Sequence, residues 1–480
     1  MTLKSALRVL LVVHVSLMLG ELSTAETPDG SSDWPQWRGP KRDGVSQESG
    51  LARDWPESGP AVVWEVDHLG LGYSSMAVQD GRIFTLGNLD GVEHVLCLDA
   101  TNGSIAWAIQ PEPVNRRLER QVSAELVRLD ADQSGGVDAT EAQSDPALSA
   151  FDTLDKSSDG LLSASELRGA FGGFRDDMGE GPRSTPAVDG NLVYTLGCKG
   201  DLACLEAATG NTLWTLNLVD DLGGQHTGRG YTESPLVDGN LLIVSPGGTG
   251  GAVVALDKRT GKLVWRSQEV DEPIQYASAV AADISGERMI VQFGSRGLFG
   301  LSARDGELLW RYERVSSGVA NVCTPIVWQD RVFAASGYGT GAGLVRIARD
   351  GEGWRAEEVY FNPRLANHHG GVVRVGDFVY GTGSTSLVAM NFLTGEVAWI
   401  NRSTGKGSLV SADGMLYLVG EEHRVALAEA TPDAYREHGR FELPDLGRPT
   451  WTHPVIAGGR LYIRNQQRLT AFDVRRAESD

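Results

Sequence analysis

Hydrophobic residues in this chain alternate with polar residues in short runs, and each run is interrupted by an Asp-Gly or similar turn. Alternation with a period of two predicts strands with one buried face, and tight turns between such runs predict antiparallel hairpins. Four of these hairpins are TPAVDGNLVYTLG (185–197), SPLVDGNLLIVSP (234–246), GGVVRVGDFVYGTG (370–383) and HPVIAGGRLYIRN (453–465). The 60 glycines agree with many turns. The pattern therefore predicts an all-β fold.

A second motif recurs along the chain and ends in tryptophan. Its five copies are CLDATNGSIAW (97–107), CLEAATGNTLW (204–214), ALDKRTGKLVW (255–265), GLSARDGELLW (300–310) and AMNFLTGEVAW (389–399). In the third copy, Asp257 and Thr260 can bond turn amides, Gly261 can adopt a positive φ, and Trp265 can pack against the next unit. A repeated unit of four short strands, about 40 to 50 residues long, predicts a β-propeller.

The aromatic residues at the ends of the outer strands set the number of blades. They are Trp64, Trp107, Trp214, Trp265, Trp310, Tyr360, Trp399 and Phe441. RLTAFDV (468–474) lacks a following outer strand and AVVWEV (61–66) lacks a preceding blade, so the two should pair and close the ring. We predict eight blades. Seven is the alternative, because residues 405–445 carry the repeat weakly, and an open β-solenoid would not need complementary ends.

The interval between Trp107 and Trp214 is too long for one blade, and it contains two oxygen-rich loops with EF-hand spacing. Calcium takes carboxylate and carbonyl oxygens at fixed positions of such a loop, with glycine at the bend. The first loop offers Asp130, Asp132, Ser134, the Gly136 carbonyl, Asp138 and Glu141. The second offers Asp155, Ser157, Asp159, the Leu161 carbonyl, Ser163 and Glu166. We therefore expect an EF-hand pair, inserted between blades 1 and 2, that binds two calcium ions.

Apolar residues flank both loops at helical spacing, as expected for EF-hand helices. They are Leu118, Val122, Leu126 and Leu129 before the first loop, and Leu167, Phe171 and Phe174 after the second. Val137 and Leu162 should join the loops through a short β-bridge. The first loop has more carboxylates, so we expect tighter binding there, in a structural rather than a signalling role. The bland alternative is an acidic, glycine-containing surface loop.

The first residues have the features of a signal peptide. The basic residues Lys4 and Arg8 come before an apolar run from Val9 to Leu19. The small residues Ser23, Thr24 and Ala25 then predict a cleavage site after Ala25. We expect a periplasmic or secreted protein without stable membrane insertion of the mature chain. An uncleaved anchor is the alternative, although the run is short for a bilayer span. The domains are then a signal peptide (1–25), the propeller with blade 1 (26–114), the EF-hand pair (115–178) and the remaining blades (179–480).

Net charge limits the classes of binding partner, and the number of cysteines limits the disulfides that the chain can form. The net charge is −20, from 43 Lys and Arg against 63 Asp and Glu, so a nucleic acid partner is not expected. Calcium and a small molecule or an envelope protein remain as partners. Four cysteines in 480 residues are too few for a disulfide framework. Cys198 and Cys204 either bridge a hairpin or stay as buried thiols.

Propellers usually bind ligands at one mouth of the central channel, where the innermost strands begin. The side chains expected there are Arg183, Tyr231, Glu233, Tyr276, Asn321, His368, His369, Trp451 and His453. Such a rim suits a polar or anionic small molecule. The alternative is that these residues line a water-filled tunnel. Because adjacent residues on a strand point in opposite directions, His368 and His369 do not predict a transition-metal site.

The repeat ALDKRTGKLVW and the early segment DWPQWRGPKRDGVS (33–46) resemble the pyrroloquinoline-quinone (PQQ) repeat superfamily of quinoprotein dehydrogenases and BamB-like propellers. The resemblance implies a propeller. In the dehydrogenases it also implies a quinone stacked on a Trp beside a disulfide between adjacent Cys, and a calcium held by Glu, Asn and Asp near a catalytic Asp. Glu233, Asn321 and Trp451 could mimic that site, but no adjacent Cys pair or catalytic Asp is found. We therefore expect a noncatalytic binding scaffold and assign no catalytic residue. A PQQ-dependent dehydrogenase and a BamB-like assembly factor are the alternatives.

Overall fold

The computed structural model of this protein describes residues 32–351 and 353–477. The predicted signal peptide, residues 1–25, lies outside the described residues. Among the helices that are described, none is both long enough and apolar enough to cross a membrane. The four cysteines are buried and have free thiols, so Cys198 and Cys204 are not bridged.

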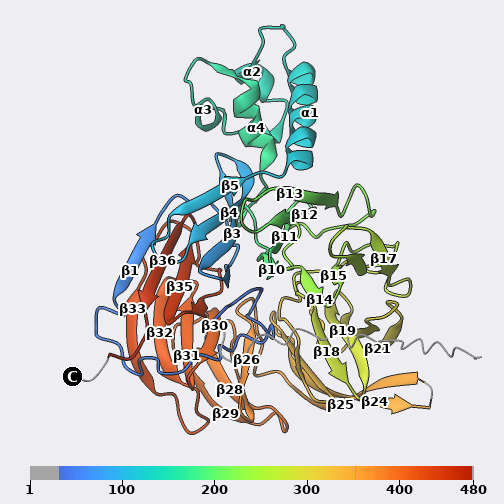
Figure 1. Ribbon diagram of the computed structural model, residues 1–480, viewed down its shortest axis with the longest axis vertical. Helices are drawn as coiled ribbons and strands as arrows, with labels where there is room; N and C mark the ends of the chain where they lie inside the picture. The colour runs from blue at the N-terminus through green and yellow to red at the C-terminus, as the bar shows by residue number, and fades with distance from the viewer. Residues whose placement is uncertain (1–31, 352, 478–480) are drawn as a thin grey trace, which may run out of the picture. The chain divides into compact units, whose positions relative to one another are not determined.

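Four-stranded antiparallel sheets, the blades, follow one another around a ring (Figure 1). From the innermost to the outermost strand, the first four complete blades are β2 (Ala77–Gln79), β3 (Arg82–Leu89), β4 (Val92–Asp99) and β5 (Ile105–Ile109); β10 (Ala187–Asp189), β11 (Leu192–Leu196), β12 (Asp201–Glu206) and β13 (Thr212–Asn217); β14 (Leu236–Asp238), β15 (Leu241–Val244), β16 (Val254–Asp257) and β17 (Leu263–Arg266); and β18 (Val280–Ile284), β19 (Glu287–Gly294), β20 (Gly297–Ser302) and β21 (Leu308–Tyr312).

The next three blades are β22 (Ile326–Trp328), β23 (Arg331–Ser336), β24 (Gly341–Asp350) and β25 (Gly353–Asn362); β26 (Val372–Val375), β27 (Phe378–Thr382), β28 (Leu387–Asn391) and β29 (Val397–Asn401); and β30 (Gly407–Ala412), β31 (Met415–Gly420), β32 (Arg424–Glu429) and β33 (Glu437–Glu442). The eighth joins both ends of the fold: β34 (Val455–Ala457), β35 (Arg460–Asn465) and β36 (Arg468–Asp473) pair with β1 (Val62–Val66). The prediction of eight blades closed by an N-terminal outer strand is confirmed. Residues 405–445 form a complete blade.

A small, mainly helical module lies between β5 and β10, beside β4 and β13 (Figure 1). Its elements are α1 (Glu112–Leu129), β6 (Val137–Asp138), α2 (Ala139–Ala142), the 3-10 helix η1 (Pro146–Leu148), α3 (Phe151–Leu154), β7 (Leu161–Leu162), α4 (Ala164–Gly172), β8 (Arg175–Asp176) and β9 (Gly179–Glu180). Its apolar side chains form a cluster of their own, which includes Leu118, Val122 and Phe171 and is completed by Val92 from β4. Phe174 lies just past the end of α4.

The repeated tryptophan joins each blade to the next. Its indole N–H donates to a turn carbonyl of the following blade at 2.9 to 3.2 Å in five pairs: Trp64 to Ala100, Trp107 to Ala207, Trp214 to Lys258, Trp265 to Ala303 and Trp399 to Thr431. In the first four pairs the glycine of that turn faces the same ring, whereas the turn at Thr431 has no glycine and Trp399 packs on Tyr435 there, with 5.8 Å between ring centroids. A Cβ on Gly261, where φ is +69°, would lie 2.7 Å from the Trp214 ring. The motif therefore marks a contact between blades, because the turn glycine of one blade leaves space for the tryptophan of the preceding blade.

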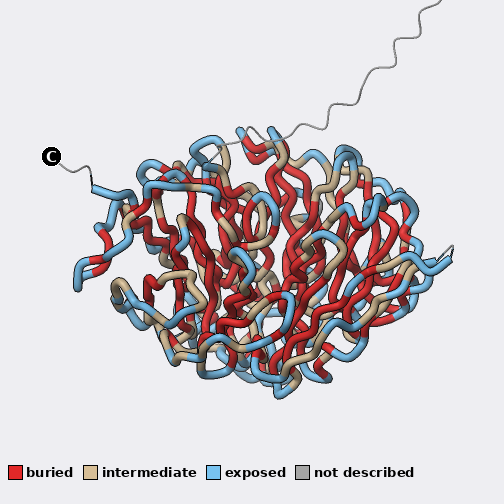
Figure 2. Tube along the Cα trace, turned by 90° about the horizontal axis from the view of Figure 1, so that it is seen from below, coloured by how far each residue is buried: buried red, intermediate tan, exposed pale blue. Residues whose placement is uncertain are grey.

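Two outer strands depart from this pattern for local reasons. Trp310 donates to the Met289 sulfur of its own blade at 3.3 Å, because the next blade has the long β24–β25 hairpin in place of the glycine turn. Phe441 packs against Phe472 at 5.1 Å between ring centroids, and a Cβ on Gly59 would lie 2.7 Å from its ring. Aromatic packing thus continues around the ring where the indole bond is lost. Figure 2 shows the strands of the blades as mostly buried and their turns as exposed.

Residues 33–46, which we call the plug, run through the centre of the ring. Trp34 exchanges two backbone hydrogen bonds with Val78 on β2, both at 2.8 Å, and the Val188 amide on β10 donates to Pro35 at 2.7 Å. Gly44 and Ser46 bond Ser411 on β30 at 2.8 to 2.9 Å. The innermost strands therefore surround protein chain rather than an open, water-filled tunnel.

Two arginines hold the tip of the plug against the ring. Arg38 donates to the Val372 carbonyl at 2.5 Å, and Arg42 donates to the carbonyls of Ser234 and Pro235 at 2.8 and 2.9 Å. Both side chains are 2% exposed. Burial lowers the pKa of Arg42 to about 9, and the charge of Glu233 opposes this shift. The plug thus connects two distant blades through buried hydrogen bonds to backbone carbonyl groups.

Replacement of Gly306 by alanine should destabilise the ring more than the same change at Gly286, although both glycines belong to the blade of β18–β21. Gly286 (φ +84°) has open space around it, so Gly286→Ala should cost only the backbone strain, about 1 kcal/mol. A Cβ on Gly306 (φ +76°) would lie 2.5 Å from the Trp265 ring, so the total should reach about 3 kcal/mol. Urea unfolding of both variants measures this difference. Equal losses would show that the Trp–Gly contact contributes little.

Candidate calcium loops and the channel mouth

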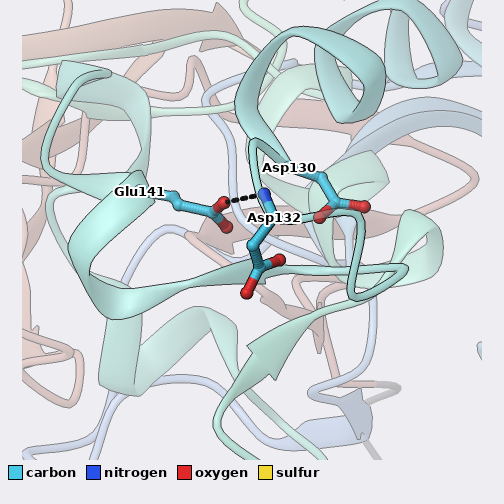
Figure 3. A group of neighbouring side chains, drawn as sticks. All are labelled: Asp130, Asp132 and Glu141. Atoms are coloured by element: carbon cyan, nitrogen blue, oxygen red, sulfur yellow. Dashed lines mark hydrogen bonds between the residues drawn. The ribbon is translucent and has the colours of Figure 1, made fainter.

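The first loop of the module places carboxylates close together. Ligand oxygens of Asp130, Asp132 and Glu141 lie within 4.8 Å of one another (Figure 3). Asp130 is the C-cap of α1 and accepts from the amides of Ser134 and Gly135 at 2.8 and 2.9 Å. These bonds fold the chain back so that Glu141, in the first turn of α2, faces the aspartates. The Asp132 amide donates to Glu141 at 3.3 Å (Figure 3).

The second loop repeats this bonding pattern. Asp155 accepts from the amides of Asp159 and Gly160 at 3.2 and 2.9 Å, and Glu166 accepts from the Ser157 amide at 3.0 Å. Ser163 and Glu166 form a capping box at the start of α4. Hydrogen bonds from the Ser163 side chain and from backbone amides lower the pKa of Glu166 to about 2, so this carboxylate is ionised at neutral pH.

Remaining ligand positions follow the same order in both loops. Asp138 caps α2 together with Glu141, as Ser163 does with Glu166. Ser134 donates to the Gly136 carbonyl at 3.1 Å, and the Leu161 amide donates to Asp159 at 2.9 Å. The expected bridge between the loops is confirmed, since β6 and β7 pair with Val137 opposite Leu162. Carboxylate, hydroxyl and carbonyl oxygens are donors that suit a hard cation such as calcium.

The nine residues predicted for the channel mouth all precede an innermost strand, but only part of the set gathers at one point. Glu421, in the β31–β32 turn, is the centre of that group. It accepts from His369 at 3.2 Å, from Lys406 at 2.9 Å and from the Trp451 indole at 3.0 Å. Burial raises the pKa of Glu421, but these three donors outweigh it and lower the pKa to about 2. A fixed carboxylate therefore lies at the mouth.

Histidines and aromatic rings extend this group in both directions. His368 shares a 2.6 Å hydrogen bond with the exposed Tyr338, and its ring centroid lies 5.4 Å from that of His369. His453 bonds the His369 carbonyl at 3.1 Å and packs on Trp37 of the plug at 4.5 Å. The plug thus forms the floor of the mouth.

Burial keeps these histidines neutral. It lowers the pKa of His368 to about 4 and that of His453 to about 3, and it also lowers the pKa of His369. In each ring Nε2 has a partner, whereas Nδ1 has none among the described residues. The ligand atoms of the three histidine rings do not gather into a metal-ligand group among the described residues.

Glu233 and Asn321 are used within the propeller wall instead. Asn321 is fully buried; its Oδ1 accepts from the Ser317 amide and the Ser336 hydroxyl, both at 2.8 Å, and its amide nitrogen donates to the Gly294 carbonyl at 2.8 Å. Glu233 is 3% exposed and accepts from the Ser245 amide. Burial raises the pKa of Glu233 to about 7.

The other three predicted residues occupy the opposite arc of the mouth. Tyr231 is buried and donates to the Pro246 carbonyl at 2.9 Å. The Tyr276 amide donates to the Asn321 carbonyl at 3.2 Å. Arg183 pairs with Asp176 at 2.9 Å and lies 5.7 Å from the centre of the Tyr73 ring. Tyr73 in turn packs on Trp451 at 5.1 Å, which connects this arc to Glu421.

The sequence did not reveal Glu421, Lys406, Tyr73 and Trp37 as members of the site. Lys406 and Tyr73 precede innermost strands, so the reasoning that selected the other nine could have found them. Glu421 lies in a turn between two middle strands, and Trp37 lies in the plug. An open pocket of about 560 Å³ adjoins Glu421, and its wall includes Lys406, His423, Arg448, Trp451 and Met178.

The arrangement does not fit the quinone site that the resemblance implies. Asn321 has both polar side-chain atoms bonded inside the wall, and Glu233 is buried beneath the plug arginine Arg42. Trp451 lies at the mouth but already packs on Tyr73 and His369, at 5.1 and 5.6 Å. We therefore derive no quinone chemistry from these residues.

Replacement of His453 by glutamine should remove part of the acid sensitivity of the fold. The folded-state pKa of about 3 lies below the ordinary value of 6.5, so below pH 6.5 the unfolded chain binds a proton that the native site rejects. Wild-type stability relative to His453→Gln should fall by about 2 kcal/mol from pH 7.5 to pH 5. Denaturant unfolding at both pH values measures this difference. The exposed His68→Gln is the control, and the same pH response in both variants would contradict the assignment.

Comparisons with known proteins agree with the propeller. A family model described as outer membrane protein assembly factor BamB matches residues 148–401, more than half of the chain. Quinoprotein alcohol dehydrogenase PedH of Pseudomonas putida is 25% identical over 335 residues, which are 61% of this chain and 52% of that protein. BamB of Shewanella oneidensis is 23% identical over 258 residues, 51% of this chain and 62% of that protein.

The crystal structure of BamB from Moraxella catarrhalis covers 86% of this chain and 99% of its own, with a TM-score of 0.53 and 16% identity. At that identity the likeness concerns the fold alone. Against the curated relatives, the chain spans about half the length of PedH. The family match and the eight repeated blades lead to one conclusion: the chain belongs to the PQQ-like repeat family described as outer membrane protein assembly factor BamB.

Proposed function

We propose that this protein is an exported, calcium-binding β-propeller that acts as a noncatalytic scaffold and binds a small polar molecule or an envelope protein at the channel mouth. One contrast carries the proposal. Glu233 and Asn321 are bonded inside the wall, whereas Glu421, Lys406 and Trp451 border an open pocket. Glu421 bonds Lys406 and Trp451, and all three also line this open pocket, where a ligand can reach them.

Calcium has a structural role in this proposal. Asp130, Asp132 and Glu141 bring three carboxylates within 4.8 Å, and like charges at that distance repel unless a cation lies between them. The module has its own apolar core, so a bound cation would stabilise the module more than the ring. Outside the cytosol, calcium concentrations keep even moderate-affinity loops filled.

Export is supported by the signal-peptide pattern of residues 1–25 and by the relatives. The Shewanella relative is named for outer membrane protein assembly, which is consistent with an envelope location for this chain. PedH, by its name, is a quinoprotein alcohol dehydrogenase, and it supports the alternative of a PQQ-dependent oxidoreductase. A BamB-like assembly role is the other alternative, and it requires co-purification with outer-membrane β-barrels.

Calorimetric titration of the calcium-stripped mature protein should detect two bound calcium ions. Asp130→Ala or Glu141→Ala should remove one of them, because each deletes an oxygen donor of the first loop, while the circular dichroism of the β-sheets stays unchanged. Asp152→Ala removes an exposed carboxylate of α3 outside both loops and should leave two ions bound. Wild-type protein that takes up no calcium would contradict the proposed metal role, and loss of β-structure in Asp130→Ala would contradict an independent module.

The same calcium-loaded sample should show no saturable uptake of PQQ and no dye reduction with an alcohol. The physical reason is that Asn321 and Glu233 are bonded within the wall and cannot serve a cofactor without breaking those bonds. Absorbance during a PQQ titration is the measurement. Saturable uptake together with alcohol-dependent dye reduction would replace the scaffold with a dehydrogenase.

A further inference from the structure

The end of the inserted module forms part of the channel mouth. We propose that calcium in the second loop orders the β8–β9 ribbon and so holds the mouth residues Tyr73 and Arg183 in place, which makes ligand binding at the mouth dependent on calcium. This inference rests on the proposed calcium and ligand sites and adds the physical connection between them.

The connection begins at Glu166, the last ligand position of the second loop. Glu166 lies in the first turn of α4, a helix of nine residues. A helix of this length is marginal by itself, so its stability depends on its cap and its packing. A cation bound by Glu166 would therefore act directly on α4. Only Gly173 and Phe174 separate the end of α4 from β8.

The ribbon that follows is held by its own bonds. Arg175 forms two hydrogen bonds with Glu180, at 2.8 and 3.0 Å, and the Gly181 amide donates to the Phe174 carbonyl at 2.8 Å. The Met178 amide donates to the Asp176 side chain at 2.8 Å. These contacts make residues 173–181 a compact unit that continues directly from the end of α4.

Several contacts join this unit to the mouth. Asp176 accepts from Arg183 at 2.9 Å and also pairs with Arg229 at 3.3 Å, and the side chains of Asp176 and Arg183 are about one-tenth exposed. The Tyr73 hydroxyl donates to the Met178 carbonyl at 2.7 Å. Met178 also borders the pocket next to Trp451 and Glu421. A displaced ribbon would therefore release Tyr73, which packs on Trp451, and Arg183.

Close packing fixes α4 to the propeller and limits how it can respond. A Cβ on Gly91, in the β3–β4 turn, would lie 2.1 Å from the Gly169 carbonyl on α4. Lys199 donates to the Phe171 carbonyl near the end of α4, and Lys156 of the second loop pairs with Asp90 at 2.9 Å. These contacts hold α4 against the propeller, so calcium would change the order of the chain that follows α4, residues 173–181, rather than displace the helix.

The first loop supplies a matched control. Its last ligand position, Glu141, lies in α2, and α2 leads into η1 and α3 within the module. Glu141 and Glu166 have the same place in their loops and the same capping box. Glu141→Gln and Glu166→Gln therefore make the same chemical change, but only the second acts on the helix that reaches the mouth.

Hydrogen–deuterium exchange of the mature protein, with calcium and after its removal, tests the connection. We expect calcium to slow exchange in residues 173–183 about tenfold in the wild-type protein. Glu166→Gln should abolish this effect and Glu141→Gln should retain it. Asp176→Asn should bind calcium as the wild type does, yet exchange rapidly in residues 173–183 even with calcium.

The outcomes separate this inference from the function proposed above. If calorimetry shows bound calcium but exchange in residues 173–183 is the same with and without it, the connection is overturned and the calcium sites stand. An equal effect of Glu141→Gln and Glu166→Gln would also overturn it. Protein that binds no calcium at all would overturn both the connection and the calcium role.

Discussion

The contact between an outer-strand tryptophan and the turn glycine of the next blade is the interaction on which the rest of this structure depends. Each blade is a sheet with an apolar face that it cannot bury by itself. The contact joins that blade to the next one, which covers this face. Trp214 and Gly261 show both halves of the contact: the indole donates to the Lys258 carbonyl, and a positive φ without a Cβ leaves room for the ring. Ring closure by β1 and β36 is then a consequence of repeating this contact until the chain meets itself.

The plug determines what occupies the centre of the ring. A ring of eight blades encloses a central space, and here Trp34, Arg38 and Arg42 fill it with buried side chains that bond the inner strands. At the mouth, Trp37 of the plug packs on His453. Burial keeps His453 neutral, whereas three donors keep Glu421 ionised. The mouth thus offers a fixed carboxylate, neutral histidines and aromatic rings.

The inserted module connects a second kind of chemistry to the same mouth. Its loops gather hard oxygen donors, and its exit ribbon places Met178 and Asp176 beside Tyr73 and Arg183. An insertion between two blades costs the ring little, because both of its ends lie on neighbouring outer and inner strands. The insertion also places its exit ribbon at the mouth, since the chain must pass the mouth to enter the next blade. In this way the proposed metal sites and the proposed ligand site share one short segment of backbone.

The sequence by itself determined the blades, the closure and the oxygen-rich loops, because each is written in local spacing: alternation along a strand, glycine and tryptophan in one motif, and ligand positions in one loop. The sequence indicates the weak blade at residues 405–445 only by Phe441 at the repeat spacing, which is why it leaves seven blades as an alternative. Tertiary structure decided what fills the centre and which polar residues remain for binding. Asn321 and Glu421 illustrate this, since both are polar residues near the mouth, but only their distant partners show that the first is used by the wall and the second faces a pocket. Some of these partners come from other blades, Gly294 for Asn321 and Trp451 for Glu421, and the repeat pattern contains no record of them.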